Sequence, residues 1–298
     1  TLSALNLLIG FLLLSAIAVV AQEIIVVFSL PNIAAARMAL PDQVFQPHIL
    51  ASFGFLAGYA TETSGKKRWV AIFICLIFLP AIMITASRSL ILLCAATCVF
   101  ALSRKARPLN LLLRWTFIGG IIALLWNALS GHGSTFMNWT YRFSKDITKD
   151  ARIEEMNAVF HEFANYPLFG NGLGYQYSYY RSAIDFEWVG GYTHNFVTYI
   201  LLTMGLVGFG VFLWLFIAII RDILATYRQI KETKSQDMRA IFWGWVSCLT
   251  VTLLYAQFQS IFRALAFPLI ISFALVGIVA LRNIDQVDEN KANYESIG

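Results

Sequence analysis

Apolar residues fill most of the chain in long blocks that short polar segments separate. A membrane-spanning helix needs roughly 20 mostly apolar residues. The blocks that approach this length are Leu2–Ala21, Ile49–Ala60, Trp69–Ala86, Leu90–Leu102, Leu111–Leu129, Phe196–Ile220, Ile241–Gln257 and Ile261–Leu281. The ten-residue segments of alternating polarity that mark the strands of a membrane barrel do not occur in the sequence. The pattern predicts an all-α fold, a polytopic membrane bundle of about 8 transmembrane helices, with residues 1–298 forming a single membrane domain.

The basic residues of the loops predict which way the helices run. Cytoplasmic loops carry an excess of Lys and Arg, and such clusters occur at 61–68, 103–110 and 221–239. The segments that alternate with them, 22–48, 87–88, 130–193 and 259–263, are then expected on the outer side. Residues 130–193 hold five basic and seven acidic side chains. We therefore expect one large periplasmic or extracellular loop there.

Composition agrees with this arrangement. The chain of 298 residues is 58% hydrophobic and only 13% charged, whereas soluble domains carry about 25% charged residues. This excludes a soluble enzyme and a disordered chain. All four cysteines fall in apolar blocks, which excludes a disulfide-stapled secreted domain. The net charge of +5 reflects the inward basic bias and does not imply nucleic acid.

The outer loop is expected to contain one amphipathic helix. Apolar residues recur at helical spacing, at Ile153, Met156, Phe160 and Phe163, opposite a polar face. Asp150 is a suitable N-cap, and the segment 165–167 ends the helix. The apolar face can lie on the membrane surface or pack on the bundle, and the sequence leaves both possibilities open.

Three alternating glycines follow at Gly170, Gly172 and Gly174. Because no P-loop Lys-Ser/Thr follows and no strand precedes them, they predict a tight turn where backbone approaches backbone, not a phosphate loop. The rest of the loop is aromatic: Tyr175, Tyr177, Tyr179, Tyr180, Trp188 and Tyr192. These rings suit a belt at headgroup level or a platform for sugar rings, and the belt is the ordinary interpretation.

Three residues are candidates for chemistry. Arg88 lies between two apolar blocks at the outward end, where a permanent charge is costly and its planar donor fork suits a phosphate or pyrophosphate. Arg152, in the first turn of the amphipathic helix, can supply a second fork. His194 precedes the longest apolar block and is the side chain suited to accept a proton near pH 7.

These residues resemble the bacterial O-antigen ligase and polymerase family of polytopic membrane glycosyltransferases. His194-Asn195 followed by Gly205 and Gly208 is similar to the family's histidine motif with Gly-x-x-Gly, and Arg88 with Leu92 to its Arg-x-x-x-Leu motif. The segment from Arg142-Phe through Arg152 to 167–174 is similar to the loop that leads to the histidine. The chain departs from the family at Met156, where a tryptophan is common, and the family usually has several more spans upstream.

The resemblance implies transfer of a glycan from an undecaprenyl-diphosphate carrier to an acceptor hydroxyl of lipid A-core or a growing glycan. The site would face the periplasm, at the outer face of the bacterial inner membrane, amid membrane lipids. Arg88 and Arg152 would stabilise the departing diphosphate, and His194 would be the base, by inverting displacement without a cofactor or metal. Arg142, Arg181, Tyr192 and Asn195 are assigned to substrate binding.

Other functions remain open on the sequence. A polymerase of the same family would differ from a ligase only in its acceptor pocket. A transporter or flippase for a lipid-linked solute would use Arg88 as a counter-charge, but would favour inverted repeats, which we do not find. A metal-dependent oligosaccharyltransferase would need carboxylates, and Asp185 and Glu187 are the close pair in the outer loop.

Overall fold

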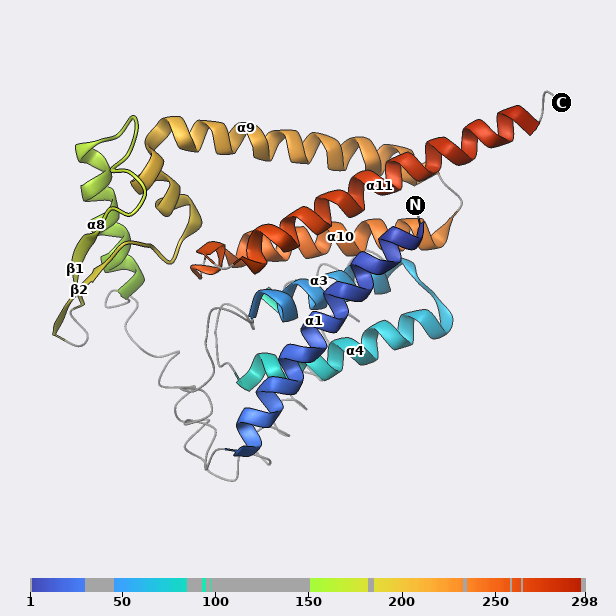
Figure 1. The fold of residues 1–298 in the computed structure, drawn as a ribbon, viewed down its shortest axis with the longest axis horizontal. Coiled ribbons are helices and arrows are strands. Elements are labelled where there is room, and N and C mark those ends of the chain that lie inside the picture. The colour runs from blue at the N-terminus through green and yellow to red at the C-terminus, as the bar shows by residue number, and fades with distance from the viewer. Residues whose placement is uncertain are drawn as a thin grey trace, which may run out of the picture. The chain divides into compact units, whose positions relative to one another are not determined.

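The structure is a computed structural model of the chain (Figure 1). It describes residues 2–29, 46–84, 93, 94, 97, 151–181, 185–232, 235–257, 259–263 and 265–295. These residues form two compact units. The helical unit comprises residues 1–101, 194–196 and 210–298, and the loop unit comprises 102–193 and 197–209. The long helix α9, Phe196–Glu232, runs through both.

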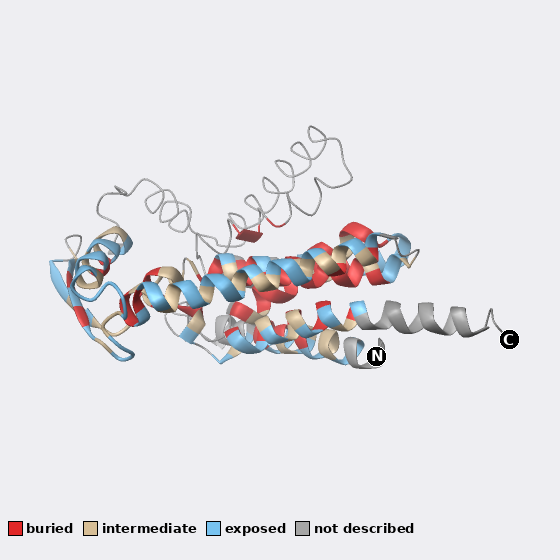
Figure 2. Cartoon of the chain, turned by 90° about the horizontal axis from the view of Figure 1, so that it is seen from above, coloured by how far each residue is buried: buried red, intermediate tan, exposed pale blue. Residues whose placement is uncertain are grey.

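The helical unit is built around a pair of closely packed helices, α3 (Gln46–Glu62) and α10 (Gln236–Tyr255). The other helices around this pair are α1 (Leu2–Ser29), α4 (Gly65–Ile84) and α11 (Ala266–Glu295), with the short 3₁₀ turn η2 (Ile261–Arg263) before α11. The buried residues in Figure 2 gather where these helices meet. The largest fully buried side chains include Phe53, Phe55, Phe242, Trp245 and Tyr255.

Small residues allow α3 and α10 to approach each other. A side chain on Gly54 would lie 3.2 Å from the backbone oxygen of Ser247, and one on Gly58 would overlap the backbone of Trp243. In lipid, the hydrophobic effect does not drive helices together, so membrane helices associate through close packing. Glycines allow the two backbones to approach closely. The two helices therefore form the tightest contact of this unit.

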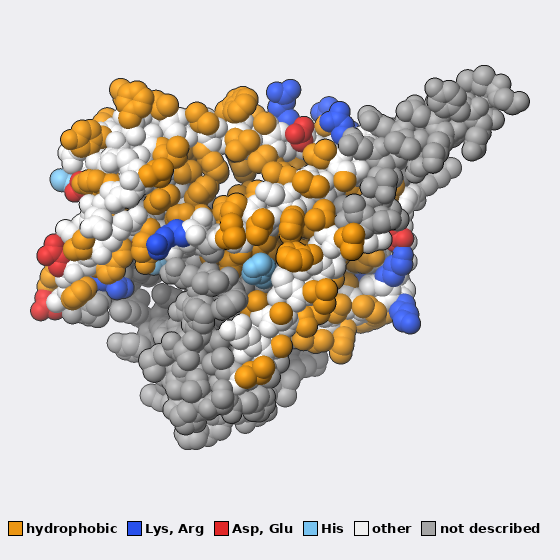
Figure 3. All heavy atoms as spheres, in the orientation of Figure 1, with side chains coloured by type: hydrophobic (Ala, Val, Ile, Leu, Met, Phe, Trp, Pro, Cys, Tyr) orange, Lys and Arg blue, Asp and Glu red, His pale blue; other side chains and the backbone are white. Residues whose placement is uncertain are grey.

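The described helices α1, α3, α4, α9, α10 and α11 each overlap a predicted apolar block. Two of them, α9 and α10, are long and apolar enough to cross a membrane among the described residues, and shorter apolar stretches occupy Asn6–Gln22 and Ala266–Arg282. Figure 3 shows hydrophobic side chains over much of the α9 surface. The blocks at 90–102 and 111–129 lie outside the continuously described residues. The count of about eight spans stays a prediction.

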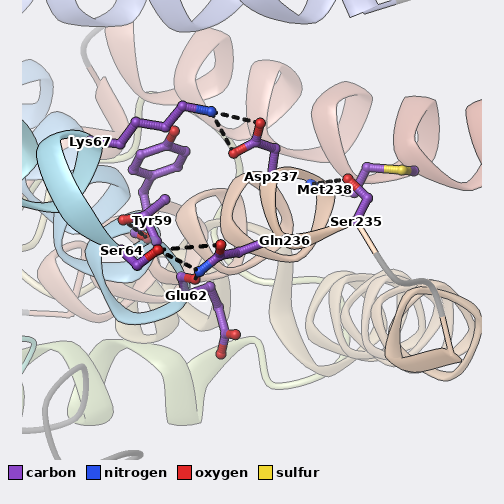
Figure 4. Close-up of polar contacts among 9 residues, drawn as sticks. Tyr59, Glu62, Ser64, Lys67, Ser235, Gln236, Asp237 and Met238 are labelled. Carbon is purple, nitrogen blue, oxygen red and sulfur yellow. Dashed lines mark hydrogen bonds and ion pairs between the residues drawn. The ribbon is translucent and has the colours of Figure 1, made fainter.

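Polar contacts tie two of the predicted cytoplasmic loops together (Figure 4). Lys67, in the first turn of α4, forms an ion pair of 2.7 Å with Asp237 at the start of α10. Nearby, the Gln236 amide donates to the backbone oxygen of Glu62. Asp237 and Gln236 belong to the basic segment 221–239, so two segments that the charge pattern assigns to one side of the membrane also lie at one end of the unit.

The opposite end of α10 meets the beginning of α9. The Asn195 side-chain amide donates to the backbone oxygen of Gln257 (3.1 Å), and the Phe196 backbone N–H donates to that of Ala256 (3.0 Å). The charge pattern assigns the segments ending at Thr193 and beginning at Gln259 to the outer side. Asn195 and Phe196 lie just after the first segment, and Ala256 and Gln257 lie just before the second. Their contact agrees with the assignment of both segments to the same side.

The loop unit contains the predicted amphipathic helix, α8 (Ala151–Asn165), and a small sheet that the all-α prediction missed. Strands β1 (Tyr177–Arg181) and β2 (Phe186–Gly190) pair antiparallel, with Tyr179 opposite Trp188. In β1, buried Tyr177 and Tyr179 alternate with exposed Ser178 and Tyr180. This period-two pattern covers only five residues, so a search for membrane strands of about ten overlooks it.

Candidate active site

The candidate base lies at the entry to α9. His194 is partly buried and stands two residues before the first helical residue, Phe196. Asn195 beside it is held by Gln257, and the buried Thr193 hydroxyl accepts a hydrogen bond of 3.1 Å from Thr198. The backbone on both sides of His194 is thus fixed. A rigid approach to the histidine suits a group that must meet a substrate hydroxyl in one geometry.

The loop unit contains a buried carboxylate. Glu155, on α8, is 3% exposed, and its Oε1 lies 2.8 Å from the hydroxyl of Tyr177 on β1. The same hydroxyl lies 3.1 Å from the backbone oxygen of Tyr192. A phenol has one proton and faces two acceptors here, so it links α8 to the segment that carries His194. The spacing of the apolar residues puts Glu155 on the predicted polar face of this helix, but the structure buries it.

Aromatic rings pack against the ring of Tyr177 and its neighbours. Trp188 packs against Tyr177, Tyr179 and Tyr192, with ring centroids 5.3–5.9 Å apart. Burial raises the pKa of Tyr179 to about 12, and burial together with the Glu155 charge raises the pKa of Tyr177 well above its usual range. Both phenols are therefore neutral donors at physiological pH. Tyr192, predicted to bind substrate, belongs to this aromatic cluster.

The two arginines of the loop unit that the structure describes lie on different elements. Arg152 is exposed in the first turn of α8, and Arg181 is partly buried at the end of β1 beside Tyr179. Both guanidinium groups are permanently charged. Arg88 and Arg142 lie outside the described residues.

The carboxylates of the metal-dependent alternative lie near the hairpin turn. Asp185 accepts a hydrogen bond from the Tyr180 hydroxyl and has a backbone φ of 51°. Glu187 pairs across the sheet with Tyr180. Within the described ranges, no three His, Cys, Asp or Glu side chains group in a way that could hold a metal ion.

The helix α9 is broken where the glycine loop meets it. Gly205 has φ 65° and ψ −163°, which interrupts the helical hydrogen bonds. The freed backbone groups pair with the glycine loop instead. Leu206 and Val207 donate to the oxygens of Pro167 and Leu168, and the oxygens of Leu202 and Thr203 accept from Asn171 and Gly172 (2.7–3.0 Å). The apolar block Phe196–Ile220 predicts one membrane span, and the break at Gly205 interrupts the helix within it.

The contact confirms the turn predicted for the glycines. Gly170, Gly172 and Gly174 all have positive φ. A Cβ on Gly170 would lie 2.6 Å from the backbone nitrogen of Gly205, and one on Gly205 would lie 2.5 Å from that of Gly170. Backbone therefore meets backbone here. The feature of the sequence that could have indicated this contact is the Gly205–Gly208 pair. It is part of the motif that resembles the family, but the motif alone does not reveal a break in the helix.

The predicted amphipathic helix packs by an unexpected face. Its fully buried residue is Val159, beside buried Glu155, whereas Met156 and Phe160 are 40% and 45% exposed. The helix joins the sheet through the hydrogen bond from Tyr177 to Glu155, and Tyr175, just before β1, donates to Glu162 (2.6 Å). Within the described residues, the apolar face is thus not the one that packs on the sheet.

Comparison with known proteins identifies the segment that carries this geometry. The family model for O-antigen ligase matches residues 71–213. This part of the chain belongs to the O-antigen ligase family. No protein with a curated description matches the chain. The matched segment contains all seven residues assigned above to catalysis or substrate binding, as well as the glycine contact at Gly205. The match supports a membrane glycosyltransferase of the O-antigen ligase or polymerase type, with lipid-linked glycans as its general class of substrate.

Proposed function

We propose that the protein is an O-antigen ligase that moves a glycan from an undecaprenyl-diphosphate carrier to a hydroxyl of lipid A-core. The observation that carries the proposal is the family match over 71–213, which includes both Arg88 and His194. The site faces the periplasm, at the outer face of the bacterial inner membrane. The bond to the diphosphate carrier supplies the free energy, so the reaction needs no nucleotide or redox cofactor.

The residues divide the chemistry between charge stabilisation and proton transfer. In the proposed mechanism the acceptor oxygen attacks the anomeric carbon and the bond to the carrier diphosphate breaks. Arg88 and Arg152 stabilise the charge on the departing diphosphate, because a fixed guanidinium fork matches phosphate oxygens. His194 takes the proton of the acceptor hydroxyl. One displacement inverts the anomeric centre and requires no divalent metal.

The remaining assigned residues bind and orient substrate. Arg142 and Arg181 contribute charge toward the donor, and Tyr192 and Asn195 flank the histidine. Two features support a fixed position for His194: the hydrogen bond of Asn195 to Gln257, and the contact of Tyr177 with the Tyr192 carbonyl. An acceptor hydroxyl must lie within about 3.2 Å of the base, so a mobile entry to α9 would be costly for turnover.

The test is donor binding measured beside turnover in purified variants. His194→Ala should keep the lipid-diphosphate donor bound while turnover falls by roughly 10²–10⁴, the usual contribution of a positioned base. Arg88→Lys should be badly impaired although it keeps the charge, because the planar fork is lost. Arg152→Lys should behave in the same way. The roles are wrong if His194→Ala abolishes donor binding while Arg88→Lys turns over normally.

Two further readings of the same assay separate the alternatives. A wild-type rate that EDTA leaves unchanged supports metal independence. If EDTA abolishes activity and Mg²⁺ or Mn²⁺ restores it, Asp185 and Glu187 become the candidate metal ligands. Product identity separates ligase from polymerase. Transfer to lipid A-core supports the proposal, and extension of the carrier-linked glycan contradicts it.

A further inference from the structure

A hollow lined by three arginines lies in the helical unit, between the C-terminal half of α9 and α11. Its volume is about 600 Å³. Arg221 and Arg228 reach it from α9, and Arg282 reaches it from α11, together with Asp222 and the apolar Leu224 and Ala225. Figure 3 shows basic side chains among the hydrophobic surface over α9. None of the residues assigned to glycan transfer lines this hollow.

The sequence places the hollow at the level of lipid headgroups. Phe196–Ile220 contains no charged residue, and Arg221 is the first charge after it. The apolar stretch of α11 likewise runs from Ala266 to its first charge, Arg282. Both helices thus leave the hydrocarbon layer at residues that line the hollow. The Gln229 side-chain amide donates to the backbone oxygen of Arg282 (3.3 Å), which holds the two helix ends together.

The hollow carries an excess of positive charge. Three guanidinium groups face one carboxylate, that of Asp222. In the part of the chain that the structure describes, none of these three arginines forms an ion pair with a protein carboxylate. Arginines that close a surface ion-pair network would have such partners. Several guanidinium forks around one hollow are typical of sites for phosphate groups.

The spacing favours an extended headgroup over a single small anion. Arg221 and Arg228 are two helical turns apart, roughly 10 Å along the axis. Leu224 and Ala225 lie between them and offer apolar surface within the same hollow. A phospholipid meets both requirements, because its phosphate carries the charge and its acyl chains can follow the apolar faces of α9 and α11 toward the membrane centre.

We propose that Arg221, Arg228 and Arg282 form a binding site for the phosphate-bearing headgroup of an anionic phospholipid. The charge pattern of the loops puts this end of α9 on the cytoplasmic side, opposite the proposed glycan-transfer site. Basic pockets between helices at this level are known to hold anionic headgroups. The bound lipid neutralises the three charges and joins the ends of α9 and α11.

Native mass spectrometry of the full chain in detergent tests the site. Phosphatidylglycerol is titrated against phosphatidylcholine, whose headgroup has the same phosphate but no net charge. The site variant is Arg221→Gln/Arg282→Gln. The matched control is Lys66→Gln/Arg68→Gln, which removes two exposed charges from the same predicted side. Wild type and control should prefer phosphatidylglycerol, and the site variant should lose about tenfold or more in its affinity for that lipid.

Four outcomes would overturn the proposal. A wild type without preference for phosphatidylglycerol shows no site, and equal losses in both double variants show only diffuse attraction. Full competition by inorganic phosphate at millimolar concentration identifies a free-anion site instead. A site variant Arg221→Lys/Arg282→Lys that binds as wild type removes the role of the guanidinium forks. Because Gln and Lys replace exposed side chains, gel filtration of each variant should show the wild-type elution.

Discussion

Two glycines far apart in the sequence meet at the break in α9. Gly170 and Gly205 face each other with backbone atoms so close that neither has room for a Cβ. Both also have φ near 65–70°, a conformation that costs other residues about 1–2 kcal/mol. The glycines are thus required for two separate reasons, backbone conformation and space.

Gly170→Ala and Gly172→Ala separate these two reasons. Gly172 has φ 90° but nothing within 4 Å of its would-be Cβ, so alanine there should cost only the conformational penalty, about 1–2 kcal/mol. Alanine at Gly170 adds overlap with the backbone of α9 and should cost about 3 kcal/mol or more. Thermal unfolding of both variants in detergent is the measurement. Equal melting temperatures would show that the close contact does not contribute.

Residue types alone could identify some of the candidate site and not the rest. Arg88, Arg152 and His194 are costly or chemically distinctive wherever they lie, so the sequence singles them out. Glu155 does not stand out, because its helix has other acidic residues at neighbouring positions. Its burial depends on Tyr177, 22 residues later, folding back in a hairpin. Polarity along a helix cannot reveal such a partner.

At the scale of elements, the hydrogen bond from Tyr177 to Glu155 joins α8 to the sheet. Tyr177→Phe keeps the ring but leaves the Glu155 carboxylate buried without this donor, which should cost about 1–3 kcal/mol. Tyr179→Phe is the matched control, since no hydrogen bond of its hydroxyl is found among the described residues. Melting temperature should fall in the first variant and stay near wild type in the second. A similar fall in both would assign the effect to ring packing.

The same sheet should respond to alkaline pH. Burial raises the pKa of Tyr179 to about 12, above the ordinary value near 10, so the folded state holds the phenol proton more tightly than the unfolded state. This contribution to stability is complete below about pH 10 and is lost as pH rises toward 12. The wild-type melting temperature should therefore drop more steeply across this interval than that of Tyr179→Phe. Parallel pH curves would contradict the assigned burial effect.

The pattern of apolar positions could predict the helices but not the break in α9 or the hairpin. Hydropathy reports how much apolar surface an element has, and α9 is apolar on both sides of Gly205. Its break depends on Pro167 and Leu168, whose backbone oxygens replace the lost helical acceptors. Every freed backbone group inside a membrane protein needs such a partner. That partner comes from a distant segment, which periodicity within one element does not contain.

At the scale of the whole molecule, the alternation of basic loops predicts the orientation of the helices. It depends on loop composition and not on the boundary of any one helix. The structure pairs segments that the pattern assigns to the same side: Lys67 with Asp237 at one end, and Asn195 with Gln257 at the other. Both contacts join residues that are far apart in the sequence. They therefore provide information that counting the charges of each loop does not use.

Single-cysteine labelling of intact cells tests the orientation that both proposed sites require. Cysteine at Ser178, exposed on β1, should react with an impermeant thiol reagent added outside. Cysteine at Ser144, outside the described residues, should react as well. Cysteine at Ser235, the N-cap of α10, should react only after permeabilisation. Permeabilised cells supply the control that each thiol can be labelled. Ser235 labelling in sealed cells with Ser178 silent would invert the chain, which would move the glycan-transfer site to the cytoplasm and the arginine-lined hollow to the outer leaflet.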